Sequence, residues 1–428
     1  MTSAAATSKH RFSAALATLS ENTYLSAIRT GIVSIVPLTI IGGLFMIVSF
    51  FPNARWEQIV KPHLQLLQVP VTATFGLLGL FACFAIAYDL GNRLKQEALV
   101  SAMIASVTFL LLQLRVEADT ITLALDGLGS KGIFTAIIVA LIAVRVQKFF
   151  GDTGLVIKLP PNVPRAVYES FLSLVPLFFL FVVFWGIRFV LGFDINHFVQ
   201  TVFKPLVFAL NTLPGILVYA LLVTLLWSVG INGDNAVDAI VAPIFLQFLA
   251  ANVEAIAVRQ PLPYITANGF FTTFVNVGGT GATIALALLM LNSKEPGFRK
   301  VSRISMPTQI FQINEPIFFG FPIVLNPVFM IPYILNALIL TASTYLLMHW
   351  NIINKPFVNV PWTTPPIIGH YLVTGGDWRA AVWGAVSILL AMAVYFPFAK
   401  AAERQRLAAE AEKLAASSAA ATVDQMTV

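Results

Sequence analysis

The sequence predicts an all-α polytopic membrane protein with about ten transmembrane helices and re-entrant hairpins. Hydrophobic residues make up 58% of the 428 residues and charged residues only 11%, whereas a soluble domain carries roughly 25% charged residues. The mean hydropathy is +0.83. Apolar runs long enough, or nearly long enough, to span a bilayer lie at 31–51, 71–90, 98–114, 132–148, 168–192, 214–229, 236–258, 280–292, 326–349 and 379–399.

The first run, 31–51, is too long for the core of a signal peptide, so we expect it to be retained as a span. Orientation follows from the basic residues, because Lys and Arg concentrate in cytoplasmic loops. The basic loops 91–97 and 145–166 are predicted to be cytoplasmic, and the more acidic loop 115–131 external. Both termini then lie in the cytoplasm, which implies an even number of spans.

The chain divides into two halves that differ in their content of polar residues within apolar segments. We assign residues 1–30 to a cytoplasmic N-terminal segment and residues 31–200, with few interior polar groups, to a membrane bundle that serves as scaffold or oligomer interface. Residues 200–378 are rich in Asn, Gly, Pro and Thr, and they make up most of the second half, residues 201–399. Because interrupted helices mark substrate sites in transporters, this half is predicted to be the transport domain.

The tail, residues 400–428, is charged and rich in alanine. Residues 401–414 favour a helix, and residues 415–428 are predicted to be disordered. The tail is either a solvated end to the last span or a docking helix for a cytoplasmic partner.

Several classes of function are excluded. The net charge of +6 does not indicate nucleic-acid binding, because the basic residues sit in short loops and at the ends of apolar runs, where they meet membrane lipid headgroups. Cys83 is the one cysteine, so no disulfide or cysteine metal cluster forms within the chain. The histidines lack metal-ligand spacing. We expect no metal and no cofactor.

The most informative segment is 312–327, QINEPIFFGFPIVLNP. It places Glu315 beside Asn314 inside a long apolar region, and an acid at membrane depth indicates a functional site. Its prolines and Gly320 forbid one continuous helix. Broken backbone at that depth is tolerated where it is buried in protein or lines a cavity. The segment is therefore predicted to be re-entrant or interrupted and to present Glu315 to a polar substrate.

Three further segments carry candidate binding residues, each with an ordinary structural alternative. In 227–235 the candidates are Asn232, Asp234 and Asn235, which either bind sugar hydroxyls or form an aqueous loop. In 276–283 they are Asn276, Gly278, Gly279 and Gly281, whose turn either approaches a ligand or packs helices tightly. Trp362 offers a flat apolar face that either stacks on a sugar or lies in the interfacial aromatic belt.

These residues belong to a wider pattern: IRTGIVSIVPLTIIGGLF at 28–45, GSKGIFTAIIVA at 129–140, KLPPNVPRAVYESF at 158–171, VGGTGAT at 277–283, INEPIFFGFPIVLNP at 313–327, PWTTPPIIG at 361–369 and TGGDW at 374–378. From about residue 25 to 395 the chain resembles the lactose/cellobiose/chitobiose family of EIIC permeases of the bacterial phosphotransferase system. Several motifs in the same order make this resemblance specific.

The resemblance implies a multi-pass protein of the bacterial inner membrane. It implies an N-terminal bundle that forms a homodimer and a C-terminal domain that holds the sugar, a β-linked disaccharide such as cellobiose or diacetylchitobiose. The bound sugar would be phosphorylated on its 6-hydroxyl by a phosphocysteine of a separate EIIB protein, which EIIA supplies. Glu315 is then the acid of the sugar site and Trp362 the stacking residue. The resemblance also strengthens the sugar-site reading of the turn at 278–281.

One position departs from the family pattern. The segment 230–233 usually carries histidine between isoleucine and glycine, and here the residue is Asn232. Asparagine bonds a hydroxyl but does not take up a proton near neutral pH. Two alternatives stay open besides the permease. One, which Asn232 and the charged tail motivate, is a sugar sensor that does not phosphorylate. The other is an ion-coupled sugar transporter, for which few buried ionisable residues are present.

Overall fold

The computed structural model describes residues 22–51, 53–117, 120–157, 160, 165–321 and 323–426. The chain forms two compact units. The first unit contains Met1–Thr212, Asp234–Asn268 and Lys355–Asn359, and the second contains Leu213–Gly233, Gly269–Asn354 and Val360–Val428. The predicted division at residue 200 into a scaffold bundle and a transport domain stays a prediction.

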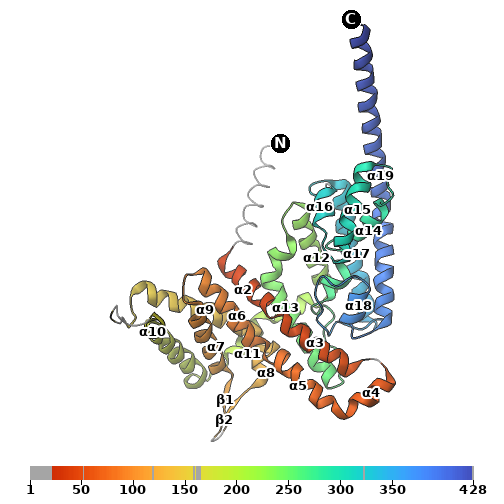
Figure 1. Cartoon of the computed structure of the whole chain (residues 1–428). Helices are drawn as coiled ribbons and strands as arrows, with labels where there is room; N and C mark the ends of the chain where they lie inside the picture. The colour runs from red at the N-terminus through yellow and green to blue at the C-terminus, as the bar shows by residue number, and fades with distance from the viewer. Residues whose placement is uncertain are drawn as a thin grey trace. The chain divides into compact units, whose positions relative to one another are not determined.

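The first unit is built around α6, which packs against α2, α7 and α9 (Figure 1). Buried Ser101 of α7 donates a hydrogen bond of 2.6 Å to Oε1 of Gln147 of α9, so the apolar interface also carries a polar link. The helices are α2 (Thr23–Ser34), α3 (Val36–Phe50), α4 (Ala54–Val60), α5 (Leu64–Thr74), α6 (Leu78–Arg93), α7 (Ala98–Gln113), α8 (Leu125–Leu128), α9 (Ile133–Thr153), α10 (Arg165–Trp185), α11 (Ile195–Leu210) and α13 (Gly233–Ala257). Shorter turns are η1 (Lys61–His63), η2 (Phe75–Leu77), η3 (Ser130–Gly132) and the π-helix η4 (Gly186–Val190).

A β-hairpin that the sequence analysis did not predict lies in loop 115–131. Strands β1 (Leu114–Glu117) and β2 (Thr120–Leu123) pair antiparallel, with Leu114 opposite Leu123. The β-branched residues Val116, Thr120, Ile121 and Thr122 favour strands. The acidic residues of this loop, Glu117 and Asp126, obscure that signal in the sequence.

Buried asparagines hold the loops of the first unit. Asn252 of α13 donates from Nδ2 to the carbonyls of Tyr264 (2.8 Å) and Pro356 (2.7 Å). Asn359 Nδ2 donates to Thr39 of α3 at 2.5 Å, and Asn268 donates to Asn359 Oδ1 at 3.1 Å. The short segment Lys355–Asn359 is therefore part of the first unit, although in the sequence it lies between Gly269–Asn354 and Val360–Val428 of the second unit.

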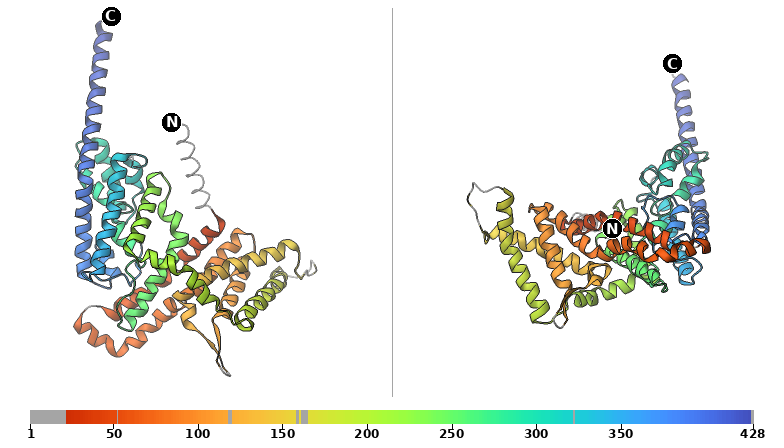
Figure 2. Two further views of the ribbon diagram at one scale, coloured as in Figure 1. Left: turned by 180° about the vertical axis from the view of Figure 1, so that it is seen from behind. Right: turned by 60° about the horizontal axis from the view of Figure 1, so that its bottom comes forward.

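The second unit is organised by α19, which packs against α14, α17 and α18. Figures 1 and 2 show α19 in blue, running along the unit and continuing past its other helices as one rod. Tyr395 lies within it and is fully buried. The elements are α12 (Leu213–Ser228), the π-helix η5 (Phe270–Val275), α14 (Ile284–Met290), α15 (Pro296–Ile310), α16 (Glu315–Gly320), α17 (Pro327–His349), α18 (Ile368–Val373) and α19 (Trp378–Met426).

The tail differs from its prediction. Helix α19 continues to Met426, so the expectation that residues 415–428 are disordered is wrong for 415–426, and residues 427–428 lie outside the described range. Alanine has the highest helix propensity, and nothing in 401–426 interrupts the helix that the last span begins.

The membrane fold is confirmed, with fewer full-length spans than apolar runs. Among the described residues seven helical segments are long and apolar enough to cross a membrane, or eight if α11 and α12 form one broken span. The predicted span at 280–292 is wrong, because α14 has seven residues and reaches only about 10 Å. The sequence analysis also missed α11.

Candidate functional site

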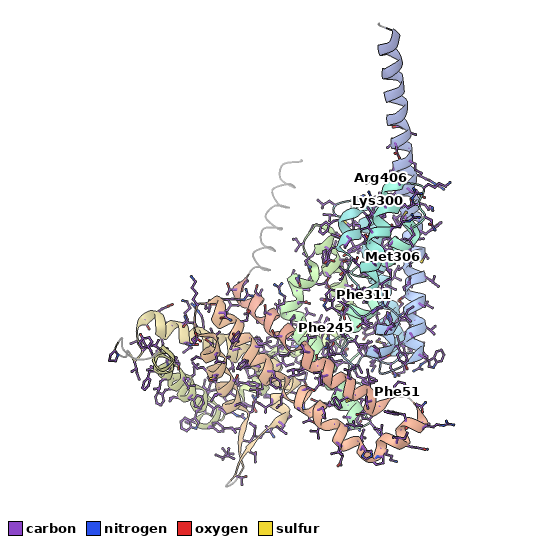
Figure 3. All side chains as sticks on the ribbon, viewed as in Figure 1. Phe51, Phe245, Lys300, Met306, Phe311 and Arg406 are labelled. Carbon is purple, nitrogen blue, oxygen red and sulfur yellow. The ribbon has the colours of Figure 1, made fainter. Side chains whose placement is uncertain are left out.

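The segment around Glu315 is an interrupted helix, as the prolines and glycine predict. Helix α15 ends at Ile310, and Figure 3 labels its C-cap, Phe311. The chain then turns through Gln312 (φ +67°), and α16 begins at Glu315 with Pro316 in its first turn. Helix α16 ends at Gly320, whose added Cβ would lie 2.5 Å from Val301 of α15. Pro322 lies outside the described residues.

Asn314 and Glu315 differ in exposure and partners. Asn314 is 6% exposed, and its Nδ2 donates to the carbonyl of Thr280 at 2.9 Å. Glu315 is exposed, and its carboxylate makes no hydrogen bond or ion pair with any described residue. The bond to Thr280 therefore fixes the side-chain amide of Asn314, while the carboxylate of Glu315 is available to a ligand.

The turn at 276–281 closes around Asn314. The amides of Gly278 and Gly279 donate to Oε1 of Gln312 at 2.5 and 3.2 Å. The hydroxyl of Tyr395 donates to the carbonyl of Gly281 at 2.8 Å. A Cβ on Gly279 would lie 2.4 Å from Cβ of Asn314, so the glycine is needed for this close approach. These glycines approach protein atoms, and their direct contact with a ligand stays a prediction.

The turn that carries Asn232 lies beside α16 in the same unit. Ser228, the last residue of α12, accepts a hydrogen bond of 2.9 Å from the amide of Leu325. Trp227 meets Phe318 of α16 edge to face, with ring centroids 5.1 Å apart. The chain turns at Gly230 (φ +88°), and Asn232 is half-buried. The structure therefore brings together the segments of Asn232 and Glu315, which are 83 positions apart in the sequence.

Asp234 and Asn235 belong to the first unit. There the carbonyl of Asn235 accepts a hydrogen bond of 3.2 Å from Arg29. The carbonyl of Asn276 in the second unit accepts from Gly279, and its buried Oδ1 has no hydrogen-bond partner among the described atoms. The Oδ1 atom of Asn276 can therefore accept a hydrogen bond from a ligand.

Trp362 lies in a turn closed by Thr364, whose hydroxyl donates to the carbonyl of Pro361 at 2.7 Å. The side chain of Trp362 is 59% exposed. The chain then enters α18, where His370 is fully buried against Phe274 of η5 at 4.5 Å between ring centroids. His370, one of the histidines without metal-ligand spacing, thus lies in the core of the second unit.

The match to a family model decides the identity. The model described as phosphotransferase system, EIIC matches residues 29–337. The chain belongs to this EIIC family. The lichenan permease IIC component of Bacillus subtilis (strain 168) is 35% identical to this EIIC over 425 residues, 94% of either chain. The cellobiose-specific EIIC component of Geobacillus stearothermophilus is 36% identical over 431 residues, 94% of this chain and 95% of that protein.

A solved structure agrees with the fold of this EIIC. The crystal structure of the transporter ChbC, the IIC component from the N,N′-diacetylchitobiose-specific phosphotransferase system, matches with a TM-score of 0.86 at 34% identity. The match covers 92% of this chain and 96% of that one. The predicted family and the predicted helical membrane fold are both confirmed, and the chain is an EIIC sugar permease with a sugar and an EIIB protein as its partners.

Two residues of this EIIC that hold the candidate site were missed from sequence. Gln312 had a local signal, because its amide stands two positions before Asn314 in an apolar segment. Tyr395 had none, because its partner Gly281 is 114 positions away. Both bond the glycine turn and so position the loop on which Asn314 rests.

Proposed function

We propose that this EIIC binds a β-linked disaccharide, such as cellobiose or N,N′-diacetylchitobiose, and translocates it while a phospho-EIIB protein phosphorylates it. The observation that carries this proposal is the exposed Glu315 carboxylate with no described partner, next to a buried and fixed Asn314. The printed names of the relatives and of ChbC support this choice of sugar, because cellobiose and diacetylchitobiose are both β-linked disaccharides.

The proposed roles follow from the chemistry of each group. Glu315 accepts hydrogen bonds from hydroxyls of the sugar, since an ionised carboxylate is an acceptor only. Asn232 and Oδ1 of Asn314 add polar contacts, and the exposed ring of Trp362 stacks on a C–H face of the sugar. A site built to pair hydroxyls rejects analogues that lack them, because its polar groups are then left unsatisfied. Gly278, Gly279 and Gly281 shape the loop around these groups.

In the proposed phosphoryl transfer the 6-hydroxyl oxygen of the sugar attacks the phosphorus of the EIIB phosphocysteine. An O–P bond forms, the S–P bond breaks, and the thiolate returns to EIIB, while the hydroxyl proton leaves to a base. Asn232 is not that base, because an amide does not bind a proton near neutral pH. In the proposed reaction a group other than residue 232 therefore takes the proton.

We also propose that the N-terminal bundle forms a homodimer in the bacterial inner membrane, with both termini in the cytoplasm. The basic loops near Arg93 and Arg145 and the acidic residue Asp126 support this orientation. Chemical cross-linking in membranes tests the dimer. Labelling of single cysteines placed at Lys95 and Asp126 in a Cys83→Ala background tests the orientation, since a membrane-impermeant reagent added to intact cells should label only position 126.

The test of the proposed function uses inverted membrane vesicles with phosphoenolpyruvate, the general phosphotransfer proteins and EIIA/EIIB pairs of cellobiose- and diacetylchitobiose-specific systems. Labelled β-disaccharides are screened for conversion to sugar phosphate. We expect a product that requires both this chain and EIIB. A sugar that binds tightly yet is never phosphorylated would contradict the proposal and favour the sensor, which the asparagine at 232 makes the second candidate. Uptake that needs no phosphoenolpyruvate and collapses with an uncoupler would indicate ion coupling.

A further inference from the structure

One end of the second unit carries a set of cations drawn from two distant parts of the sequence. Figure 3 shows Lys300 of α15 and Arg406 of α19 at this end, with Met306 and Phe311 further along α15. We call the set the basic surface: Lys294, Arg299, Lys300, Arg303, Arg404 and Arg406. All six are exposed, and none forms an ion pair with a carboxylate among the described residues.

The two carboxylates nearest in sequence are buried and used internally. Glu403 is 4% exposed, accepts hydrogen bonds from Ser293 Oγ (2.5 Å) and the Lys294 amide (2.6 Å), and pairs with Lys400 at 2.7 Å. Glu295 is 8% exposed and caps α15 by accepting from the amide of Phe298. Glu410 and Glu412 lie one turn and more beyond Arg406 on α19. The surface therefore faces solvent as a region of positive charge.

The basic surface has a fixed geometry. Glu403 joins α19 to Ser293 and Lys294, just before α15, and the Arg406 guanidinium lies 4.8 Å from the centre of the Phe298 ring. Phe298 in turn stacks on Phe321, 4.7 Å away and nearly parallel. Phe321 follows directly after α16. Buried contacts thus hold the cations relative to one another and to the segment that carries Glu315.

We propose that the basic surface is the docking site for the phosphorylated EIIB protein, through an acidic face of that protein. This inference rests on the proposed function. Charge complementarity is the main reason, since arginine forks match carboxylates and phosphoryl groups and a cluster of one sign steers an oppositely charged partner. EIIB must meet the unit that holds the sugar, and the basic surface and Glu315 belong to the same unit.

The distance between the basic surface and the segment of Glu315 is comparable to the size of a small protein. Lys300 and Ile310 are ten helical positions apart, or about 15 Å, and Gln312 and Glu315 follow directly. A partner of about 100 residues has a radius of gyration of about 13 Å. A partner of that size has dimensions similar to this separation along α15. A lipid headgroup is the alternative ligand of this surface. Attraction to headgroups requires only basic residues near the membrane, so it does not explain why contacts between α15 and α19 fix the positions of these cations.

The test compares full-length protein in nanodiscs, with phospho-EIIB from the cellobiose- or diacetylchitobiose-specific system as the probe. Arg299→Glu/Lys300→Glu removes two cations whose side chains make no described hydrogen bond. We expect the KM for phospho-EIIB to rise about tenfold or more and its salt dependence to weaken. The sugar Kd, and kcat at saturating EIIB, should stay within twofold. The milder Arg299→Gln/Lys300→Gln variant should give an intermediate rise.

The matched control is Lys95→Glu/Arg145→Glu, which makes the same charge change at exposed positions of the first unit that are also predicted to be cytoplasmic. It should leave the KM for EIIB unchanged. An unchanged KM in the Arg299/Lys300 variant, or an equal rise in the control, overturns the docking proposal while the permease function stands. A rise seen in discs with phosphatidylglycerol but absent from pure phosphatidylcholine discs also overturns it and assigns the surface to lipid. Absence of sugar phosphate with every EIIB overturns the proposed function itself, and the docking proposal with it.

Discussion

Oε1 of Gln312 accepts the amide hydrogens of Gly278, at 2.5 Å, and of Gly279. The Gln312 side chain, which lies between α15 and α16, thus accepts the backbone N–H groups of a turn about 34 positions earlier in the chain. Gln312→Leu leaves the buried amide of Gly278 unpaired, which costs on the order of 1–3 kcal/mol, while the amide of Gly279 keeps its bond to the carbonyl of Asn276. We predict a lower Tm and sugar binding weakened at least tenfold. Sugar titration by calorimetry and a melting curve measure both.

Gln309, one turn earlier on α15, supplies the control. It is fully buried, and both amide atoms lack a described hydrogen-bond partner. Gln309→Leu therefore removes no described bond and should leave stability equal or higher. Equal losses in the two variants would contradict the role given to Gln312.

Glu315 is predicted to bind sugar without contributing to folding. Because its exposed carboxylate has no described partner, Glu315→Ala should leave expression and Tm unchanged and abolish uptake. Glu315→Gln keeps an acceptor but loses the charge and should weaken binding roughly 10- to 100-fold, since a hydrogen bond to a charged group contributes about 1.5–3 kcal/mol. Radiolabelled sugar uptake and equilibrium binding provide the measurement. Normal uptake by the alanine variant would remove Glu315 from the site.

Asn232→His tests the one departure from the family pattern. An imidazole titrates near pH 6.5 and moves a proton, which an amide does not. We predict faster sugar phosphate formation at saturating EIIB and a new pH dependence of kcat between about pH 5.5 and 7.5, with a sugar Kd within threefold. A pH profile of kcat for both proteins decides this. Identical profiles would show that residue 232 only orients the sugar.

Asn252 is predicted to be a stability determinant of the first unit. Its amide group bonds the carbonyls of Tyr264 and Pro356 and accepts the Tyr264 amide at 3.0 Å. Asn252→Leu should lower stability by about 3 kcal/mol, because these buried backbone groups lose their partners. Gln247→Leu on the same helix is the control, since Oε1 of Gln247 lacks a described partner. Thermal melts of both variants in detergent make the comparison, and equal melting temperatures would contradict the prediction.

Asp377 of the TGGDW motif gives a pH prediction. Burial raises the pKa of this carboxyl, but the Arg379 guanidinium, at 2.9 and 3.0 Å, and the amides of Asn354 and Arg379 outweigh burial and hold the pKa below 3.8. The folded state therefore binds the proton more weakly than the unfolded state. The stabilisation is present above about pH 3.8 and is lost as the pH falls through the lower folded pKa. The Tm difference between wild type and Asp377→Asn should shrink from pH 5 to pH 3.

Asp126→Asn is the control for that experiment, since it removes the same charge at an exposed position. Its Tm difference from wild type should be small throughout. A constant difference for Asp377→Asn would show that Asp377 acts by shape alone. In the structure its carbonyl also accepts the amide of Ala380 at the start of α19, so the aspartate of this motif starts a helix.

The sequence by itself determined the membrane class, the positions of most spans and the family. These follow from local properties: apolar length, the residues that interrupt helices, and motifs in order. The breaks around Glu315 could be predicted because Pro316 and Gly320 act on their own backbone. The span at 280–292 was wrong because hydropathy does not register that the turn at Gly278–Gly281 shortens α14.

Only the tertiary structure decided which distant residues meet. The bonds from Gln312 to Gly278 and from Tyr395 to Gly281, and the approach of Arg406 to Phe298, join positions between 34 and 114 apart. Such pairs depend on how helices pack, and the periodicity of a single sequence shows which face of a helix packs but not which distant residues it meets. The sequence alone predicted Glu315 as a binding residue. Only the fold showed that the turn at 276–281 holds the neighbouring Asn314, and that the basic surface lies at one end of the same unit.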